Sequence, residues 1–321
     1  MSFRNRKEFP WWNTQFWPDE YPKEHFDTPS TLCGALLARL LADWANRLGL
    51  SAIVDLGCGD GTLLRHLATA SPANISLIGI DVRPLPDQPR VTFRRQYWCV
   101  SKECWEPSDW VHPGPSSQAW PNHPVLAFAV EWLDDLPAVV SHRKPGRAAL
   151  EIDPDGGQRP LSRADTDWLR QWWPAPGRAV IGRTRERTWQ WLAARLPPGS
   201  VLATLDYGHT RDDRPHDGGL AAHYRGAPVP PGGGGNTTAA VAVDALAAAI
   251  ESSGAERWWL QRLADLPEDF WPVEDEHPLT HLALRSQRQI LTDPAHFGAF
   301  WLVAHRIPAR GAAGPGASGR P

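Results

Sequence analysis

Residues 52–64 read AIVDLGCGDGTLL, and this stretch decides the fold. Its first five residues are apolar apart from one aspartate, which is typical of a buried strand. Glycines follow at positions 57, 59 and 61, and the leucines after them begin an amphipathic helix. Gly57 permits a sharp turn, while Gly59 and Gly61 lack the Cβ that would keep a ligand from the backbone. The stretch therefore predicts a strand, a ligand-binding turn and a helix.

Two acidic residues narrow the identity of that ligand. Asp55 lies just before the first glycine, and LIGIDV at 77–82 predicts a second strand that ends in Asp81. A carboxylate at the end of the second strand can accept hydrogen bonds from ribose hydroxyls. Asp55 favours the ammonium group of an amino-acid ligand, and Asp60, at the helix start, disfavours a pyrophosphate. This pattern predicts S-adenosylmethionine, with NAD, FAD or a ligand-free turn as the alternatives.

The cofactor prediction names six residues, which are Asp55, Gly57, Cys58, Gly59, Gly61 and Asp81. Among them Cys58 could be a reactive thiol, but a small packed side chain is the simpler interpretation.

The rest of the chain alternates between apolar runs and amphipathic segments. Further strands are expected at 91–97, 124–130 and 201–205, with a strand pair around 147–157 and two last strands near 280–284 and 299–305. Helices are expected at 30–49, at 184–195, at 239–252 and around Trp168 and Trp172, and long loops at 105–124 and 209–238. Such alternation predicts an α/β fold, with helices on both faces of a doubly wound, mostly parallel sheet.

The expected organisation is one large domain with flanking segments. Residues 1–29 are expected to be irregular, because prolines interrupt them. The domain would cover 30–307, with insertions on the substrate side at about 141–198 and 209–238. Residues 308–321 have a composition typical of a disordered tail.

Composition and charge exclude several classes of function. The chain has 33 basic and 36 acidic residues and a formal charge of −3, whereas duplex nucleic-acid binders carry a basic excess. No apolar run approaches the roughly 18 residues of a membrane span, and the first residues do not resemble a signal peptide. Four cysteines without a Cys/His cluster predict reduced thiols, no metal site and a cytoplasmic location.

Five further stretches, taken in order, carry a family resemblance. They are AVEWLDDLPA (129–138), GSVLATLDYGH (199–209), HYRG (223–226), TTAAVAVDAL (237–246) and QILTDPAHFGAFWLV (289–303). Together with the glycine-rich stretch they resemble the MidA family of class I SAM-dependent methyltransferases, over about residues 26–305. That family is bacterial and mitochondrial, and its mitochondrial member is a complex I assembly factor that acts on a protein arginine.

The resemblance implies a Rossmann-like sheet of seven strands with a reversed final hairpin, and methyl transfer from S-adenosylmethionine. The six residues above would bind the cofactor, Asp55 near its methionyl end and Asp81 at its ribose. The chain departs from the family pattern at Val130, Asn236 and Ala245. These positions surround the expected substrate pocket, so the cofactor is more firmly implied than an arginine substrate.

Three residues are candidates for the catalytic machinery. Methyl transfer is an in-line displacement, so the enzyme must hold the acceptor atom close to the methyl carbon. Glu131, at the end of the fourth strand, could orient an amine or guanidinium and stabilise its charge, or it could only cap the next helix. Asp206 and Tyr207 end the next strand, where Tyr207 could donate a hydrogen bond to substrate or stabilise a turn. Trp98 and Trp132 could line an aromatic pocket.

The sequence leaves three functions open. The first is methyl transfer to a nitrogen, such as that of a protein arginine. The second is N- or O-methylation of a small molecule in specialised metabolism. The third is a catalytically weakened SAM-binding module that assembles with a partner. The acceptor is accordingly either a protein or a small molecule.

Overall fold

The computed structural model describes residues 27–81, 87–99, 104–107, 121–152, 156–224, 227–229 and 236–308. The predictions for residues 1–26 and for the tail after residue 308 lie outside these ranges, as does most of the loop expected at 105–124. No helix among the described residues is long and apolar enough to cross a membrane.

A central nine-stranded sheet organises the molecule, in the order β15-β16-β10-β5-β1-β2-β3-β4 with β14 beside β10. Its strands are β1 (Ala52–Leu56), β2 (Ser76–Asp81), β3 (Val91–Cys99), β4 (Cys104–Pro107), β5 (Val125–Val130), β10 (Val201–His209), β14 (Val241–Ala242), β15 (Glu256–Arg262) and β16 (Phe300–Arg306). Strands β3, β2, β1, β5 and β10 run parallel to one another. By contrast, β4 is antiparallel to β3, and β16 is antiparallel to both β10 and β15. The predicted α/β class, the mostly parallel sheet and the reversed final hairpin are confirmed.

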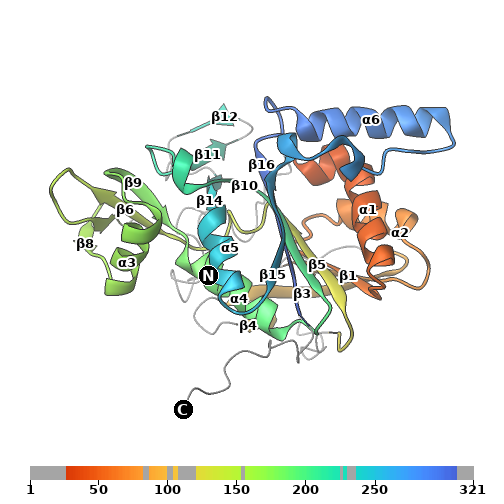
Figure 1. Cartoon of the computed structure of the whole chain (residues 1–321), viewed down its shortest axis with the longest axis horizontal. Helices are drawn as coiled ribbons and strands as arrows, with labels where there is room; N and C mark the ends of the chain where they lie inside the picture. Colours follow the sequence, from red (N-terminus) through yellow and green to blue (C-terminus); the bar gives the residue numbers. More distant parts are fainter. Residues whose placement is uncertain are drawn as a thin grey trace, which may run out of the picture.

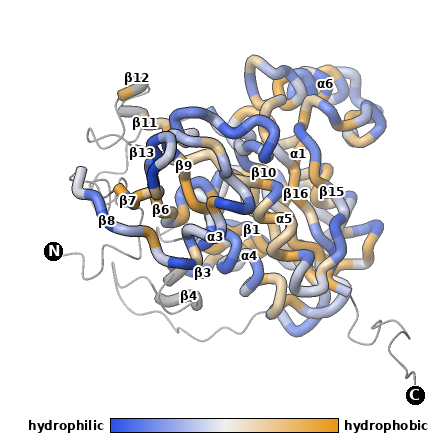
Figure 2. The backbone as a smooth tube through the Cα atoms, turned by 60° about the vertical axis from the view of Figure 1, so that its left-hand side comes forward, coloured by the Kyte–Doolittle hydropathy of each residue, from blue (hydrophilic) through white to orange (hydrophobic). Residues whose placement is uncertain are grey.

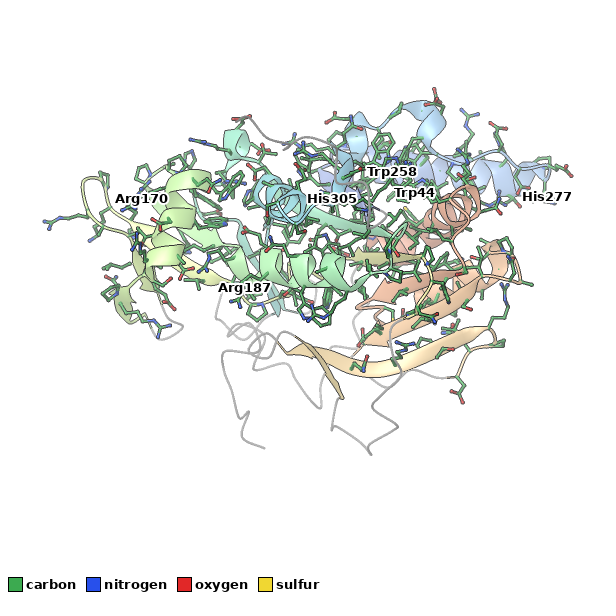
Figure 3. All side chains as sticks on the ribbon, turned by 60° about the horizontal axis from the view of Figure 1, so that its bottom comes forward. Trp44, Arg170, Arg187, Trp258, His277 and His305 are labelled. Carbon is green, nitrogen blue, oxygen red and sulfur yellow. The ribbon has the colours of Figure 1, made fainter. Side chains whose placement is uncertain are left out.

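Helices cover both faces of this sheet (Figure 1). One face carries α1 (Pro29–Arg47), α2 (Thr62–Ala70) and α6 (Pro278–Thr292), and the other carries α4 (Arg183–Arg195) and α5 (Val243–Glu251). Hydrophobic segments gather in the interior and hydrophilic ones at the periphery (Figure 2). On the first face Trp44 of α1 packs on Trp258 of β15, with ring centroids 4.6 Å apart (Figure 3).

An insertion between β5 and β10 forms a smaller sheet, at the left of Figure 1. It contains β6 (Val139–Arg143), β7 (Leu150–Ile152), β8 (Gln158–Pro160), α3 (Arg163–Trp172) and β9 (Gly177–Ile181), with antiparallel strand order β8-β7-β6-β9. The expected strand pair is β7 and β8, whereas β6 and β9 were not predicted. Trp168 and Trp173 are buried in its core.

Two predictions near the C-terminal half were wrong. Residues 280–284 lie inside α6, where Leu284 and Leu291 form a buried helical stripe, and the strand that pairs with β16 is β15. The region 209–238 is not only loop, because β11 (Leu220–Tyr224), β12 (Ala227–Pro228) and β13 (Asn236–Ala239) pair in the order β12-β11-β13. These stretches are short and carry no clear alternation of apolar and polar residues, so the sequence pattern could not show them.

Smaller corrections concern element boundaries and the number of strands. The helix expected at 239–252 begins only at Val243, because β14 pairs with β10. Strand β10 continues to His209, beyond the apolar run that ends at Leu205. The central sheet exceeds the expected seven strands because β4 and β14 add to it.

Candidate active site

The glycine-rich turn lies at the carboxyl end of β1, beside β5, where open α/β sheets bind ligands. Gly57 and Gly59 both have positive φ angles, +69° and +62°, which L-residues with a side chain rarely adopt. The backbone N–H groups of Gly57 and Cys58 donate to the Ile80 carbonyl at 2.8 and 3.1 Å. The turn is thereby tied to the end of β2.

Trp132 explains why position 57 accepts only glycine. A Cβ at Gly57 would lie 2.4 Å from Cδ1 of Trp132, far inside van der Waals contact. Trp132 in turn contacts Trp189 of α4, with ring centroids 6.3 Å apart. This tryptophan therefore packs between the glycine-rich turn and α4. The side chain of Trp98, the other candidate for an aromatic pocket, lies outside the described part of the structure.

The two predicted acidic residues lie close together. Asp81 Oδ2 accepts a hydrogen bond from the Gly59 N–H at 2.8 Å, so the second acid is joined directly to the turn. Asp55 is only 3% exposed in β1. Burial, reinforced by the charge of Asp81, raises the pKa of Asp55 to about 8. A cationic ligand would favour the ionised form of Asp55, so the pair of acids suits such a ligand.

The start of α2 does not offer a free anion site. Asp60 Oδ1 accepts hydrogen bonds from the N–H of Thr62 at 2.9 Å and from its hydroxyl at 2.6 Å. Arg65 pairs with the same carboxylate at 3.3 Å. Since a pyrophosphate would need those N–H groups, this arrangement agrees with the sequence argument against a dinucleotide. Cys58 is 7% exposed and packs in the core, which fits a structural side chain.

Glu131 follows β5 in an unusual backbone conformation. Its φ angle is +48°, although it is not glycine, and its N–H donates to the Leu205 carbonyl at 3.0 Å. The left-handed region costs a non-glycine residue about 1–2 kcal/mol, and such strain is concentrated at functional sites. Its Oε2 atom is buried and has no hydrogen-bond partner among the described residues. The conformation therefore aims an unsatisfied carboxylate oxygen into the protein.

Asp206 and Asp134 complete an acidic cluster with Glu131. Asp206 is 1% exposed, and its Oδ2 accepts from the N–H groups of Leu133 at 3.0 Å and Asp134 at 3.3 Å. Its Oδ1 and that of Asp134 are buried without a partner among the described residues. Burial raises the pKa of Asp206 well above its usual value, and the charge of Glu131 adds to the rise. The pKa of Glu131 is raised in the same way by burial and by Asp134 and Asp135.

Two further residues frame this cluster. The Tyr207 hydroxyl is hydrogen-bonded to Thr238 Oγ1, and its ring packs on Phe300 at a centroid distance of 5.9 Å. Arg185 on α4 is 1% exposed and lies near the acids. Sequence reasoning missed Arg185, although a signal exists: it lies four residues before Trp189 and seven before Leu192, on the buried face of its helix.

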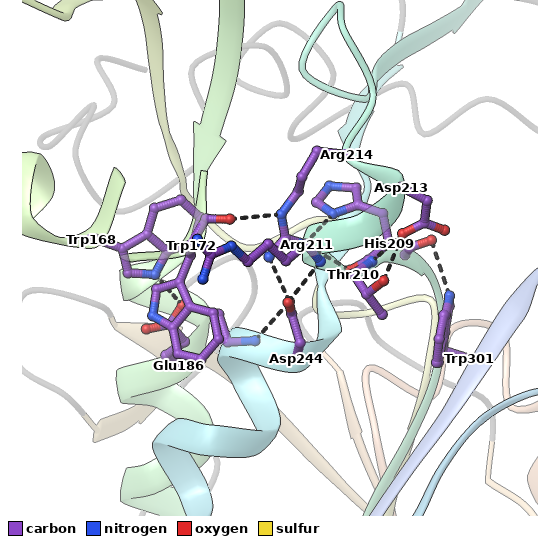
Figure 4. Close-up of polar contacts among 12 residues, drawn as sticks. Trp168, Trp172, Glu186, His209, Thr210, Arg211, Asp213, Arg214, Asp244 and Trp301 are labelled. Atoms are coloured by element: carbon purple, nitrogen blue, oxygen red, sulfur yellow. Dashed lines mark hydrogen bonds and ion pairs between the residues drawn. The ribbon is translucent and has the colours of Figure 1, made fainter. Parts of the chain in front are cut away.

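A second polar network joins the insertion to β10 (Figure 4). Arg214 pairs with Asp244 at 2.6 Å, and donates to the carbonyls of His209 at 2.9 Å and Trp172 at 3.1 Å. It also lies 2.6 Å from His209 Nδ1, and because a guanidinium can only donate, that nitrogen accepts. Burial and the Arg214 charge lower the pKa of His209 to about 3. This histidine is therefore neutral and structural, and Asp244 gains a role that the sequence did not suggest.

Proteins similar to this chain were found by comparing structures. No protein-family model matches the chain, and no curated protein matches its sequence significantly. A crystal structure of a COG1565 superfamily protein from Burkholderia thailandensis is 20% identical, with a TM-score of 0.65, and covers 92% of this chain and 86% of its own. A second COG1565 superfamily member from that organism, bound to S-adenosyl-homocysteine, is 19% identical, with a TM-score of 0.63 over 88% of this chain and 78% of its own. The chain therefore has the fold of these COG1565 superfamily structures, as the order of its motifs predicted.

Proposed function

We propose that this chain is a SAM-dependent methyltransferase. The proposal is supported by the shared fold with a structure bound to S-adenosyl-homocysteine, and by the buried acids beside the glycine-rich turn. Asp55 and Asp81 would hold the methionyl ammonium and the ribose, while Gly57, Cys58, Gly59 and Gly61 face the cofactor. The cofactor supplies an electrophilic methyl group on a sulfonium. A cytoplasmic, bacterial setting remains a prediction.

The acceptor that we propose is a nitrogen, such as that of an arginine on a protein. One observation carries this choice: the buried Oε2 of Glu131 has no partner among the described residues, and unsatisfied oxygens of Asp134 and Asp206 lie in the same acidic cluster. A buried carboxylate oxygen without a partner costs free energy, so it favours a ligand that brings N–H donors and positive charge. An amine or guanidinium provides both, whereas a neutral hydroxyl provides only one donor.

Glu131 is the proposed catalytic residue. It would orient the acceptor nitrogen and take up the proton released as the N–CH₃ bond forms and the S–CH₃ bond breaks. Asp206 would fix the loop after β5 through its bonds to the N–H groups of Leu133 and Asp134, and offer its Oδ1 to the acceptor. Tyr207, whose hydroxyl is engaged by Thr238, would shape the site.

The test uses Glu131→Gln, which keeps the shape and removes the carboxylate, with the exposed Glu268→Gln as matched control. Radiolabelled SAM is incubated with each variant and with host lysate that has been separated by molecular size. We expect Glu131→Gln to bind S-adenosyl-homocysteine normally and to lose transfer by about 10²–10⁴-fold. Transfer that survives in Glu131→Gln would contradict the catalytic role.

The same assay separates the alternatives. Label in the protein fraction supports a protein acceptor, and label in the small-molecule fraction supports N- or O-methylation in specialised metabolism. A labelled methyl group that is recovered on an oxygen atom would contradict the nitrogen acceptor. Binding of S-adenosyl-homocysteine without transfer in any fraction would overturn the enzyme proposal in favour of an assembly module.

A further inference from the structure

Arg185 is a fully buried cation whose hydrogen bonds go to backbone carbonyls. Its Nη2 donates to Asp134 O at 2.7 Å and its Nε to Leu136 O at 3.4 Å. Its Nη1 donates to Ala239 O at 2.9 Å and Ala240 O at 3.3 Å. Within the described residues no ion pair of Arg185 with a carboxylate is present. The guanidinium therefore links two separate backbone segments through hydrogen bonds.

Those two segments border the proposed acceptor site. Residues 134–136 follow Glu131 in the loop after β5, and Ala239 directly follows Thr238, the partner of Tyr207. They are more than 100 residues apart in the chain. One side chain from α4 thus joins the loop that contains Glu131 and Asp134 to the end of β13, whose Thr238 is hydrogen-bonded to Tyr207.

The charge of Arg185 acts on the same cluster. The acidic groups that face it are Asp134 and Asp135 from the loop after β5, and Asp206 and Tyr207 from β10. Beyond them Glu131 raises the pKa of Asp206. Arg185 opposes this rise, because it lowers the pKa of both Asp134 and Asp206.

We propose that Arg185 is a positioning residue for the acceptor site: its guanidinium holds residues 134–136 against Ala239 and Ala240 and places its positive charge beside the carboxyl groups of Asp134 and Asp206. The expected effect of Arg185 on methyl transfer rests on the proposed function. Its expected effect on stability and on the charges of the neighbouring acids does not, so the two effects can be tested separately.

The first test compares Arg185→Gln and Arg185→Lys with Arg195→Gln, an exposed arginine near the end of the same helix. Urea unfolding is followed from pH 5.5 to pH 9 without ligand. In Arg185→Gln the folded-state pKa values of the two acids rise further above their unfolded values. A carboxyl group of this kind loses stability as pH rises from its unfolded pKa towards its folded pKa. The wild type and Arg185→Gln should therefore lose stability together until the pH reaches the folded-state pKa of the wild type. The deficit of Arg185→Gln should grow with pH above that point.

The expected growth is about tenfold in the unfolding equilibrium constant for each pKa unit gained. Arg185→Lys keeps the positive charge but not the four hydrogen bonds to backbone carbonyls, so its loss of stability relative to the wild type should be constant over this pH range. Arg195→Gln should follow the wild type at every pH. Adding Asp206→Asn to Arg185→Gln should flatten the pH dependence, since it removes one of the two acids.

A deficit in Arg185→Gln that stays constant above the pH at which the wild-type curve levels off would overturn the charge role, because the loss of backbone bonds alone predicts that result. A wild-type curve that is still falling at pH 9 would also overturn it, since the two acids would then stay protonated despite Arg185. If Arg185→Gln does not fold, Arg185→Lys decides: a curve parallel to the wild type supports the proposal, and a deficit that grows with pH refutes it.

The second readout is methyl transfer from labelled SAM across the same pH range. We expect Arg185→Lys to lower kcat at least tenfold, while the affinity for S-adenosyl-homocysteine changes less than threefold, because Arg185 contacts no residue of the 57–61 turn in the hydrogen bonds above. Unchanged transfer would contradict the positioning role. If the wild type transfers no methyl group, the proposed function is refuted, but the unfolding curves still test the effect of the Arg185 charge on the neighbouring acids.

Discussion

Substituting Gly57 with alanine tests whether Trp132 and the backbone together require glycine in the turn. The φ angle of +69° should cost alanine about 1–2 kcal/mol. The contact of 2.4 Å between the new Cβ and Trp132 Cδ1 should add about 1–3 kcal/mol, the usual cost of overpacking. We therefore expect Gly57→Ala to lower the free energy of unfolding by about 2–5 kcal/mol.

Gly49 provides a matched control at the end of α1. Its φ angle is +65°, and nothing lies within 4 Å of a Cβ built there. Gly49→Ala should therefore cost only the backbone term, about 1–2 kcal/mol. In a Trp132→Ala background the cost of Gly57→Ala should fall close to that value, since the two indole atoms at 2.4 and 2.8 Å are gone and only the Cβ of residue 132, at 3.2 Å, remains.

The measurement is urea unfolding followed by circular dichroism, with the cost taken from the shift in midpoint at constant slope. The reasoning predicts a coupling of about 1–3 kcal/mol between Gly57→Ala and Trp132→Ala. It would be refuted if Gly57→Ala and Gly49→Ala cost the same, or if the Trp132→Ala background left the cost of Gly57→Ala unchanged.

Three further predictions concern buried charges. The pKa of Asp55 is raised to about 8, so the chain should lose stability as pH rises from about 4 to about 8. In urea unfolding, Asp55→Asn should remove on the order of several kcal/mol of that loss. An equal dependence of stability on pH in both proteins would contradict this prediction. Arg214→Met leaves Asp244 and the His209 ring without their cation, so we expect a loss of about 3–5 kcal/mol, against a smaller loss for Arg262→Met at the half-exposed pair with Asp213. Because the pKa of the His209 ring is lowered to about 3, the stability that the neutral ring contributes is complete above its unfolded pKa near 6.5 and is lost as pH falls towards 3. The ring signals of His209 in an NMR titration should therefore not shift between pH 8 and pH 5. A titration midpoint near 6.5 would contradict the burial of this ring against Arg214.

Local patterns predicted the parts of the fold that have strong periodicity. Apolar runs mark the buried strands β1, β5 and β10, and a helical stripe marks α1. The spacing of its glycines marks the turn at 57–61. The strands of the insertion and β15 have mixed or exposed faces, so no such signal marks them. The strand predicted at 280–284 was wrong because five residues are too few to show a helical stripe. That stripe, with Leu284 and Leu291 buried, emerges only over the full length of α6.

Site residues were predictable where a strand end places them. Four acids lie at or near the end of the apolar run of a parallel strand, so parallel topology brings them to the same edge of the sheet; they are Asp55, Asp81, Glu131 and Asp206. Arg185 and Thr238 reach the site by tertiary packing from α4 and β13, and nothing local to their sequence fixes that contact. The same holds for Trp132, whose contact with Gly57 depends on how β5 lies beside β1.

Titration of the folded chain with S-adenosyl-homocysteine by isothermal calorimetry tests the central claim most directly. The account predicts binding of one molecule per chain, weakened by about 10–100-fold in Asp81→Asn, because a charge-assisted hydrogen bond contributes about 1.5–3 kcal/mol. Glu131→Gln, on the acceptor side, should bind as tightly as the wild type. A folded wild-type chain that gives no binding heat and no shift in thermal unfolding with this ligand would contradict the account.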